Sequence, residues 1–280
     1  MLETKTIELG PERSIHAVQA GKGPDLLLLH GALTTHSDWR EGPFDALAKH
    51  FRVTALDRPG HGLSRRPRFE GSARSQAAQI ADGLDALCVG PAIVVGHSMG
   101  GLVALALAEG FRERVAALIL VAPLAFPELR LLEQGLMGPR AFPLIGPLLS
   151  RIGQGTIDRP ILAIVQRMMF APQAVPPAWA ANYPYDLIMT SEAMVAEGEE
   201  TSSILPFAPT AIIDFAAIRT HVQILAGTAD QVADPKRHAR PLAAALPESR
   251  LIEVEGVGHM VHHIAPEKVL EAALAASVFA

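Results

Sequence analysis

Strand-length apolar runs alternate with helical stretches along most of this chain, and this alternation constrains its fold more than any other feature. The runs read DLLLL, FRVTAL, AIVVG, VAALILV, HVQILAG and RLIEVEG, and apolar residues at helical spacing lie between them. Strands that are apolar on both sides are typical of parallel sheets covered by helices on both faces. We therefore expect an α/β protein with a mostly parallel, doubly wound sheet.

The alternation is absent at two places. Residues 4–9 and 14–20 predict an N-terminal β-hairpin around the turn residues Gly10 and Pro11. Residues 124–217 carry many prolines and helical apolar stretches without a clear strand. They predict a mostly helical insertion after the sixth strand.

This prediction divides the chain into a core domain, residues 1–123 and 218–280, and a cap (lid) formed by residues 124–217. The cap includes the apolar stretch LRLLEQGLMGPRAFPLIGPLLSRIG, which begins at Leu129 and has few charges. Such a stretch could rest on a lipid surface. Because its prolines and glycines break any long amphipathic helix, we expect it to pack within the cap instead.

Composition argues against several classes of protein. Hydrophobic residues make up 49% of the chain and charged residues 19%, which is typical of a globular protein. A net charge of −5 argues against a nucleic-acid partner, since phosphate binding needs a basic face. The N-terminus lacks the pattern of a signal peptide, and no run approaches the roughly 20 apolar residues that cross a bilayer. We expect a cytoplasmic protein without stable membrane insertion.

Two isolated features have structural interpretations. Arg65, Arg66 and Arg68 form the one local basic cluster, and we predict that they lie in a solvated loop. Cys88 is the single cysteine, so the chain forms no intramolecular disulfide. We predict a buried structural thiol at this position.

The stretch VVGHSMGGLVALALAEG runs from an apolar strand into an alanine-rich helix, with Ser98 at the turn between Gly96 and Gly100. At a sharp strand-to-helix turn, side chains two residues away on either side would collide, so glycines are needed there. Such a turn strains the serine and aims its oxygen outward. The G-x-S-x-G pattern alone is a modest signal in a chain with 23 glycines, so its context decides its interpretation.

Two further residues suited to acyl transfer lie at strand ends. Asp230 follows VQILAG, and His259 follows LIEVEG. Because ligands and chemistry gather at the carboxyl ends of parallel strands, we expect both side chains near Ser98. Imidazole would take the serine proton, and a carboxylate on the far ring nitrogen would fix the tautomer and stabilise the imidazolium. The order Ser98, Asp230, His259 therefore predicts a catalytic triad.

Acyl transfer also needs donors for the oxyanion that develops. Met99 begins the helix after the turn, and the free N–H groups at a helix N-terminus favour negative charge. The second donor should come from the loop after LLLLHG, where we choose the Ala32 N–H. Met99 and Ala32 are thus the predicted oxyanion hole.

Five motifs together resemble a known superfamily. They read LLHGALTTHSDW, LDRPGHGLS, VVGHSMGG, LAGTADQVADP and VEGVGHMVHH, and the match covers residues 20–123 and 218–277. With them the chain resembles a serine hydrolase of the α/β-hydrolase fold superfamily, of the kind with a helical cap. The resemblance implies Ser98 as the nucleophile on a nucleophile elbow, Asp230 as the orienting acid and His259 as the base.

Several other polar residues have structural interpretations. His262 and His263 lie close to His259, but no acidic residue stands at ligand spacing among them, so we predict no metal site. We expect Asp57 to hydrogen-bond the turn that follows it, and Asp234 to cap the next helix. The remaining histidines near strand ends are expected to support loops, and they are His30, His61 and His97. No dinucleotide or phosphate-loop motif is present, so we predict no cofactor.

The substrate prediction depends on apolar residues. Leu33 beside the oxyanion loop, and Met168, Trp179 and Tyr183 in the cap, are predicted to line a pocket for an apolar group. Methionine and aromatic side chains would let the cap adapt to its ligand. We therefore predict a small apolar carbonyl substrate, a carboxylic ester, thioester or lactone, cleaved through an acyl-enzyme.

Other functions on the same scaffold remain open. A carbon–carbon bond hydrolase of vinylogous diketones uses the same triad, and so does peroxyacid formation. A non-catalytic receptor for a small ligand is a third alternative, although a pure binding protein has no use for all three triad residues. Epoxide and haloalkane hydrolases need a carboxylate nucleophile, and this chain has Ser98 at that position.

Overall fold

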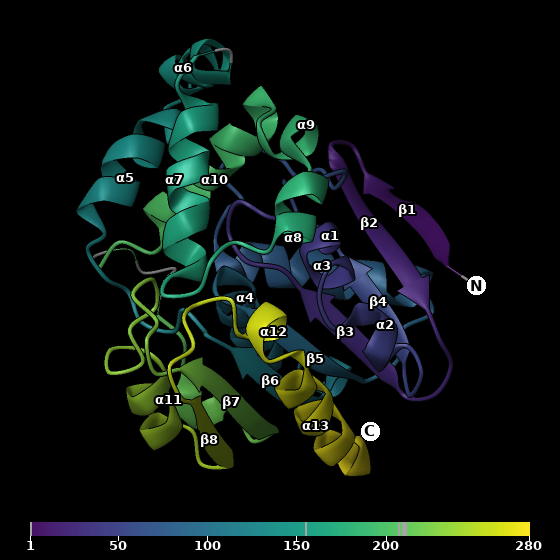
Figure 1. Cartoon of the computed structure of the whole chain (residues 1–280). Helices are drawn as coiled ribbons and strands as arrows, with labels where there is room; N and C mark the ends of the chain where they lie inside the picture. Colours follow the sequence, from purple (N-terminus) through teal and green to yellow (C-terminus); the bar gives the residue numbers. More distant parts are fainter. Residues whose placement is uncertain (1, 155, 207, 209–211) are drawn as a thin grey trace.

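An eight-stranded sheet, in the order β1-β2-β4-β3-β5-β6-β7-β8, forms the centre of the molecule (Figure 1). The structure is a computed structural model, and it describes residues 2–154, 156–206, 208 and 212–280. The strands are β1 (Glu3–Gly10), β2 (Arg13–Ala20), β3 (Asp25–Leu29), β4 (Arg52–Leu56), β5 (Ala92–His97), β6 (Val115–Val121), β7 (His221–Gly227) and β8 (Ser249–Val254).

The pairing of the strands confirms the predicted hairpin and the predicted parallel sheet. β1 pairs antiparallel with β2, and β2 pairs antiparallel with β4. Every other pair, from β4 through β3, β5, β6 and β7 to β8, is parallel. The carboxyl ends of six strands therefore meet at one edge, where loops converge.

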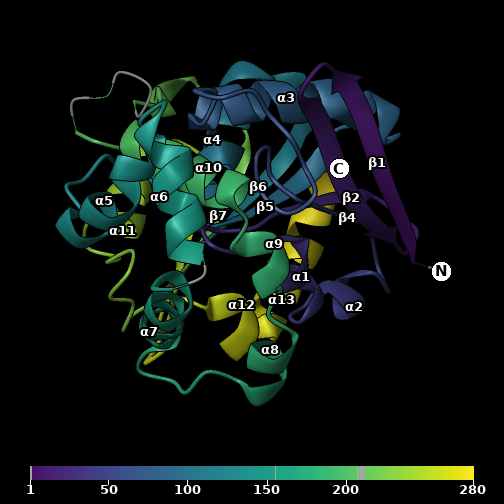
Figure 2. The same cartoon turned by 90° about the horizontal axis from the view of Figure 1, so that it is seen from above.

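Helices pack on both faces of this sheet, which confirms the doubly wound architecture (Figure 2). In β3, Leu27 and Leu29 face one layer, and Leu26 and Leu28 face the other. The first layer holds α3 (Ala73–Ala86), α4 (Met99–Gly110) and α11 (Ala239–Ala245). The second layer holds α1 (His36–Arg40), α2 (Phe44–Leu47), α12 (Val261–Ile264) and α13 (Pro266–Ala276).

Six α-helices of the described chain lie between β6 and β7, and we call this segment the helical insertion. They are α5 (Leu131–Met137), α6 (Ile145–Gln154), α7 (Asp158–Phe170), α8 (Pro177–Asn182), α9 (Tyr185–Ile188) and α10 (Ser191–Ser203). They lie above the sheet in Figure 1. The predicted range 124–217 also includes residues 155, 207 and 209–211, which lie outside the described residues. The division into a core domain and a cap stays a prediction.

One end of the helical insertion departs from the expected self-packing. Leu144, Leu148 and Ile152 are 89%, 58% and 58% exposed, and α6 lies at the top of the molecule, away from the sheet (Figure 1). The buried residues of α6 are instead small, namely Gly146, Ser150 and Gly153. The expectation was wrong here because small residues let α6 approach its neighbours closely, and its large apolar residues face outward. No helix of the described residues is long and apolar enough to cross a membrane.

Two local expectations are corrected by the structure. Cys88 is exposed, with φ +57°, because the neighbouring Leu87 and Val89 fill the interior on either side of it. Asp234 does not cap α11, since that helix begins only at Ala239. Its carboxylate instead accepts a hydrogen bond from the Lys236 N–H in the turn before the helix.

Candidate active site

Ser98 lies at the sharp turn between β5 and α4, with φ +52° and ψ −116°. A Cβ at Gly100 would lie 2.3 Å from the Leu29 carbonyl oxygen, and a Cβ at Gly96 would lie 2.4 Å from the Gly100 carbonyl oxygen. Both positions therefore require glycine, as the sequence predicted. A non-glycine residue held at positive φ stores backbone strain, and such strain gathers at functional sites.

Asp230 and His259 form a buried pair at the ends of β7 and β8. The His259 Nδ1 and the Asp230 Oδ2 lie 2.8 Å apart, and their side chains are 2% and 1% exposed. The other carboxylate oxygen accepts the N–H groups of Val232 and Ala233 at 2.7 and 2.9 Å. With both oxygens engaged, the carboxylate is fixed, and Nδ1 donates to it. The His259 Nε2 is then left as a proton acceptor.

His97 connects this pair to the turn. It precedes Ser98 in the chain, and its ring lies 4.7 Å from the His259 ring, centroid to centroid. The Ser98 hydroxyl makes no hydrogen bond with a described residue. The structure therefore brings Asp230 and His259 into contact, and it places His259 against the neighbour of Ser98.

The two predicted oxyanion donors lie beside the turn. Met99 is the first residue of α4, so its N–H has no acceptor within the helix. Ala32 follows Gly31, where a Cβ would lie 3.3 Å from the Cβ of Ser98. Neither N–H finds a hydrogen-bond acceptor elsewhere among the described residues. That these two N–H groups bind an oxyanion stays a prediction.

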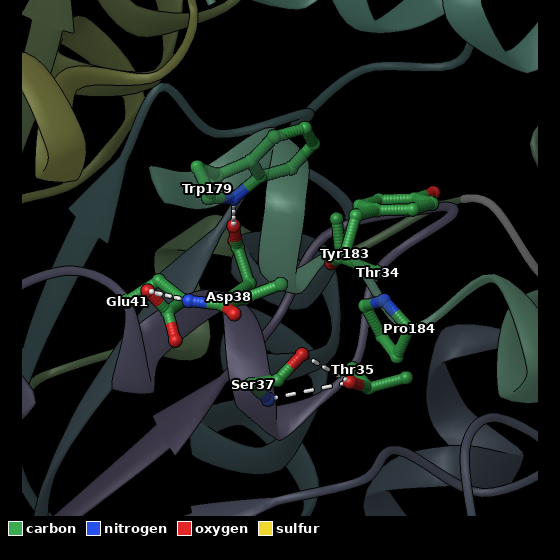
Figure 3. Close-up of a pocket in the computed structure, with 9 residues that line it drawn as sticks. Thr34, Thr35, Ser37, Asp38, Glu41, Trp179, Tyr183 and Pro184 are labelled. Atoms are coloured by element: carbon green, nitrogen blue, oxygen red, sulfur yellow. Dashed lines mark hydrogen bonds between the residues drawn. The ribbon is translucent and has the colours of Figure 1, made fainter. Parts of the chain in front are cut away.

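A second cluster of histidines lies next to this site. Asp38, from α1, accepts hydrogen bonds from His262 and His263 at 2.9 and 2.8 Å. It also accepts the Trp179 indole N–H at 2.9 Å (Figure 3). Burial would raise the pKa of Asp38, but the two histidines hold it well below its usual value. The sequence showed no acid near these histidines because the acid comes from the far end of the chain.

The ligand atoms of Asp38, His97 and His262 lie within 4.8 Å of one another, a spacing that suits a metal ion. The two oxygens of Asp38 are, however, each occupied by a histidine. Burial lowers the pKa of His262 to about 4 and that of His97 well below its usual value, so both rings are neutral at pH 7. Asp38, His262 and His263 thus form a hydrogen-bonded cluster beside the site, and the expectation that these histidines hold no metal stays a prediction.

The predicted pocket residues separate into three places. Leu33 lines a cavity of about 10 Å³ with apolar side chains of the helical insertion, among them Met137, Leu162, Met189 and Met194. Trp179 and Tyr183 line a different cavity of about 10 Å³, between α1 and α8 (Figure 3). Met168 is 49% exposed and lines neither of them. That these residues bind substrate stays a prediction.

Buried charges join the helical insertion to the sheet. Glu199 of α10 pairs with Arg66, with 2.6 Å between Oε2 and Nη1, and with Arg68. The Arg66 and Glu199 side chains are only 3% and 4% exposed. A solvated loop is therefore the wrong prediction for Arg66, because α10 covers it. Arg65 is 59% exposed and pairs with Glu8 at the surface.

Two further carboxylates of α10, those of Glu197 and Glu200, are buried near the loop after β3 that carries Ala32 and Leu33. Glu197 Oε1 lies 3.4 Å from the His61 Nδ1, and Glu200 Oε1 lies 3.7 Å from the His61 Nε2. Burial and Arg58 lower the pKa of His61, but the two carboxylates outweigh them, so it lies above its usual value. Burial raises the pKa of Glu200, but Arg58 and His61 hold it well below its usual value.

The buried charges of Arg58, Glu197 and Glu200 were not predicted from the sequence, and Asp57 was assigned the wrong partner. From the sequence, Glu197 and Glu200 are expected on the surface of a helix, and no local pattern indicates that Arg58 is buried. Asp57 was expected to bond the turn Arg58-Pro59-Gly60, but its carboxylate bonds the following segment at Leu63 instead. Its oxygens accept from the His36 N–H and ring and from the Leu63 N–H, at 2.8 to 2.9 Å, and so hold the loops on either side of β4.

Comparisons with known proteins show the family and the fold of the chain. The model of the alpha/beta hydrolase family matches residues 26–272. An uncharacterized protein of Mycobacterium tuberculosis is 30% identical over 282 residues, which cover 92% of this chain and 78% of that protein. The pimeloyl-(acyl-carrier protein) methyl ester esterase of Nitrosomonas europaea is 42% identical over 109 residues, which cover 39% of this chain and 41% of that protein.

Among solved structures, a serine hydrolase of Cycloclasticus zankles has a TM-score of 0.77 at 21% identity. The similarity covers 100% of this chain and 98% of that chain. At this identity the likeness concerns the fold alone. The α/β-hydrolase fold that the five motifs predicted is thereby confirmed.

Proposed function

The chain belongs to the alpha/beta hydrolase family, and on that premise we propose that it is a serine hydrolase acting on a carboxylic ester, thioester or lactone. The observation that carries the proposal is the buried Asp230–His259 pair next to the strained turn that presents Ser98. The esterase relative supports an ester as substrate.

The first half of the reaction forms an acyl-enzyme. The Ser98 Oγ attacks the carbonyl carbon while the His259 Nε2 takes its proton. Asp230 holds the Nδ1–H and stabilises the imidazolium that results. The carbonyl oxygen becomes an oxyanion and accepts hydrogen bonds from the N–H groups of Ala32 and Met99. The tetrahedral intermediate then collapses, and the leaving alkoxide departs with the proton from His259.

The second half releases the acid. A water molecule attacks the acyl carbon, and the His259 Nε2 takes a proton from it. The second tetrahedral intermediate uses the same two N–H donors. Its collapse expels the Ser98 oxygen, which recovers its proton from His259, and the carboxylic acid leaves. The enzyme returns to its starting protonation state.

We also propose that the helical insertion, residues 124–217, acts as a cap with an apolar acyl site beneath it. The cavity beside Leu33 supports this assignment because leucine, isoleucine, valine and methionine side chains line most of it, together with Asp158, whose charge is paired with Arg140. Its volume of about 10 Å³ holds roughly one water molecule. An acyl chain therefore requires movement of the helical insertion before it binds.

The test is hydrolysis of p-nitrophenyl esters from acetate to dodecanoate. We expect turnover by the wild type, with the preferred chain length giving the size of the acyl site. Ser98→Ala should lower kcat on the order of 10⁶-fold if the triad acts as a unit. A fluorophosphonate probe should label Ser98 in the wild type, read by mass spectrometry of its peptide.

Ser150→Ala is the matched control. Ser150 is a fully buried serine of α6 whose hydroxyl has no hydrogen-bond partner in the described chain, so its removal should leave kcat unchanged. A loss of only a few-fold in Ser98→Ala would refute the nucleophile assignment. Labelling of Ser98 without turnover of any ester would instead move the proposal to carbon–carbon bond hydrolysis.

A further inference from the structure

The Ala32 N–H shares a peptide unit with the Gly31 carbonyl. The bond between these residues is trans, since the one cis peptide of the described chain is Ala171–Pro172. In a trans unit the N–H and the C=O lie in one plane and point in opposite directions. Whatever holds the Gly31 oxygen therefore also sets the direction of the Ala32 N–H.

Three donors converge on that oxygen. The His30 Nδ1 lies 2.8 Å from it, the Arg58 Nη2 lies 3.0 Å from it, and the Thr34 Oγ1 lies 3.1 Å from it. The His30 Nε2 accepts the Arg58 N–H at 2.9 Å, so its Nδ1 carries the proton. Burial, together with Arg58, lowers the pKa of His30 to about 3, which keeps this neutral tautomer at any working pH.

Arg58 is the charged member of this set, and it is fully buried. Its Nε donates to the His30 carbonyl oxygen at 2.7 Å, and its Nη1 donates to Gln76 at 2.8 Å. Glu200 of α10 accepts from both terminal nitrogens, with 3.1 Å between Oε2 and Nη2. A bidentate carboxylate fixes the plane of a guanidinium group as well as its charge. The helical insertion thus sets the orientation of Arg58.

Two residues of the helical insertion, Glu197 of α10 and Tyr183 at the end of α8, hold the next two peptide units of the loop. Glu197 accepts the Leu33 N–H at 2.5 Å, and the Tyr183 hydroxyl donates to the Leu33 carbonyl. Leu33 has φ +53°, a backbone conformation that a leucine adopts only when its surroundings impose it. Consecutive peptide units of the loop are therefore held by residues that depend on the helical insertion.

We propose that Arg58, held in place by Glu200, is a positioning residue that aims the Ala32 N–H at the oxyanion. This inference rests on the proposed function. A donor that already points at the developing charge needs no reorganisation when the transition state forms, which is the main source of oxyanion stabilisation. Arg58 touches no substrate atom and acts through the Gly31–Ala32 peptide. The helical insertion thereby couples its own docking to the rate of acyl transfer.

Arg58→Lys is the informative variant because it keeps a positive charge beside Glu200 and removes the planar fork that reaches the Gly31 and His30 oxygens. We expect kcat for a p-nitrophenyl ester to fall about 10²-fold, the loss typical of one oxyanion donor, with KM within about threefold of the wild type. The Kd of an alkyl boronic acid, which forms a tetrahedral adduct on serine, should rise by a similar factor. Glu200→Gln, which keeps the shape of the side chain, should give a smaller loss of the same kind.

Arg66→Lys is the matched control. Arg66 and Glu199 form an equally buried pair, 3% and 4% exposed, that also joins the loop after β4 to α10, and the hydrogen bonds of Arg66 go to Glu199, Pro67 and Ala196 rather than to Gly31. This variant should lower the melting temperature to a similar extent and leave kcat and boronate affinity unchanged. If Arg58→Lys does not fold, Glu200→Gln decides the question by the same readouts.

Two outcomes overturn the inference. One is a folded Arg58→Lys variant whose kcat equals that of the wild type. The other is a loss in Arg58→Lys that Arg66→Lys reproduces, since that loss follows from stability alone. Labelling of wild-type Ser98 by the fluorophosphonate separates these results from a failure of the proposed function, because the nucleophile is then shown to react whatever Arg58 does.

Discussion

In the sheet, the four leucines of β3 are fully buried, whereas in the helical insertion Leu144 is 89% exposed and the carboxylates of Glu199 and Glu200 are buried. The sheet is held by apolar area removed from water, which depends little on direction. The helical insertion also contacts the core through an apolar cluster that includes Phe170, Trp179 and Met260, and its helix α10 adds paired charges with the loop after β4, which depend strongly on geometry. A buried ion pair adds little net stability, but losing one partner is costly. The apolar core around the sheet therefore supplies most of the stability, and the paired charges of α10 set the orientation of the loop after β4.

The largest expected difference between the regions concerns glycine. Gly100→Ala would place a Cβ 2.3 Å from the Leu29 carbonyl oxygen, and backbone atoms of the sheet do not yield. We expect a loss of more than about 4 kcal/mol, or no folding, in urea unfolding. Gly135→Ala in α5 meets nothing within 4 Å and should raise stability by about 0.5–1 kcal/mol. Equal effects at the two positions would contradict the contrast in packing.

The next effect concerns the buried charges. Glu199→Ala leaves the Arg66 guanidinium buried without its carboxylate and should cost about 3–5 kcal/mol in chemical denaturation. Glu192→Ala is the control on the same helix, since Glu192 is exposed, and it should cost less than about 1 kcal/mol. A similar small loss for both variants would mean that α10 is not held by its buried carboxylates.

Acid should affect stability with opposite signs through two buried histidines, His262 beside the sheet and His61 at the contact with α10. The pKa of His262 is lowered to about 4 by burial, so the unfolded chain takes up its proton first, and stability falls as the pH drops from 6.5 towards 4. The pKa of His61 is raised, so its contribution is present below pH 6.5 and is lost as the pH rises through the folded value. Each of these histidines changes the slope of the free energy of unfolding against pH by at most about 1.4 kcal/mol per pH unit.

Urea unfolding at pH 7.5 and pH 5 measures both contributions. We expect His262→Asn to flatten the loss of stability on acidification, and His61→Gln to steepen it. The same change in both variants would show that the two histidines do not differ as their surroundings indicate.

The smallest effect is expected at the outer face of α6. Leu148→Ser should change the free energy of unfolding by about 0.5 kcal/mol or less, because Leu148 is 58% exposed. Leu28→Ala in the sheet should cost about 2–5 kcal/mol. A loss above about 2 kcal/mol in Leu148→Ser would mean that α6 buries this residue in solution.

Local patterns carried much of the prediction. The alternation of apolar runs predicted the strands, and the glycines around Ser98 predicted a turn that the structure shows at φ +52°. Asp230 and His259 could be selected because each follows an apolar strand, and parallel strands end at a common edge. These inferences need only neighbouring residues and the geometry of a strand.

Pairs that are distant in the chain were not predictable in this way. Arg58 and Glu200 are 142 positions apart, and His262 and Asp38 are 224 positions apart. A charged residue on a helix is predicted to lie at the surface, because burial of a charge requires a partner and no local pattern identifies that partner. The exposure of Cys88 and of the α6 leucines likewise depended on how neighbouring segments pack.

The sequence by itself therefore determined the sheet, the turn that presents Ser98 and the strand ends that carry Asp230 and His259, because chain sterics and apolar periodicity act over a few residues. Only the tertiary structure decided which carboxylate meets Arg58, what holds the loop of Ala32, and which face of the helical insertion stays in water. Those features arise when α10 packs against the sheet, and the physical reason is that a buried charge is stable only beside a partner that folding brings to it.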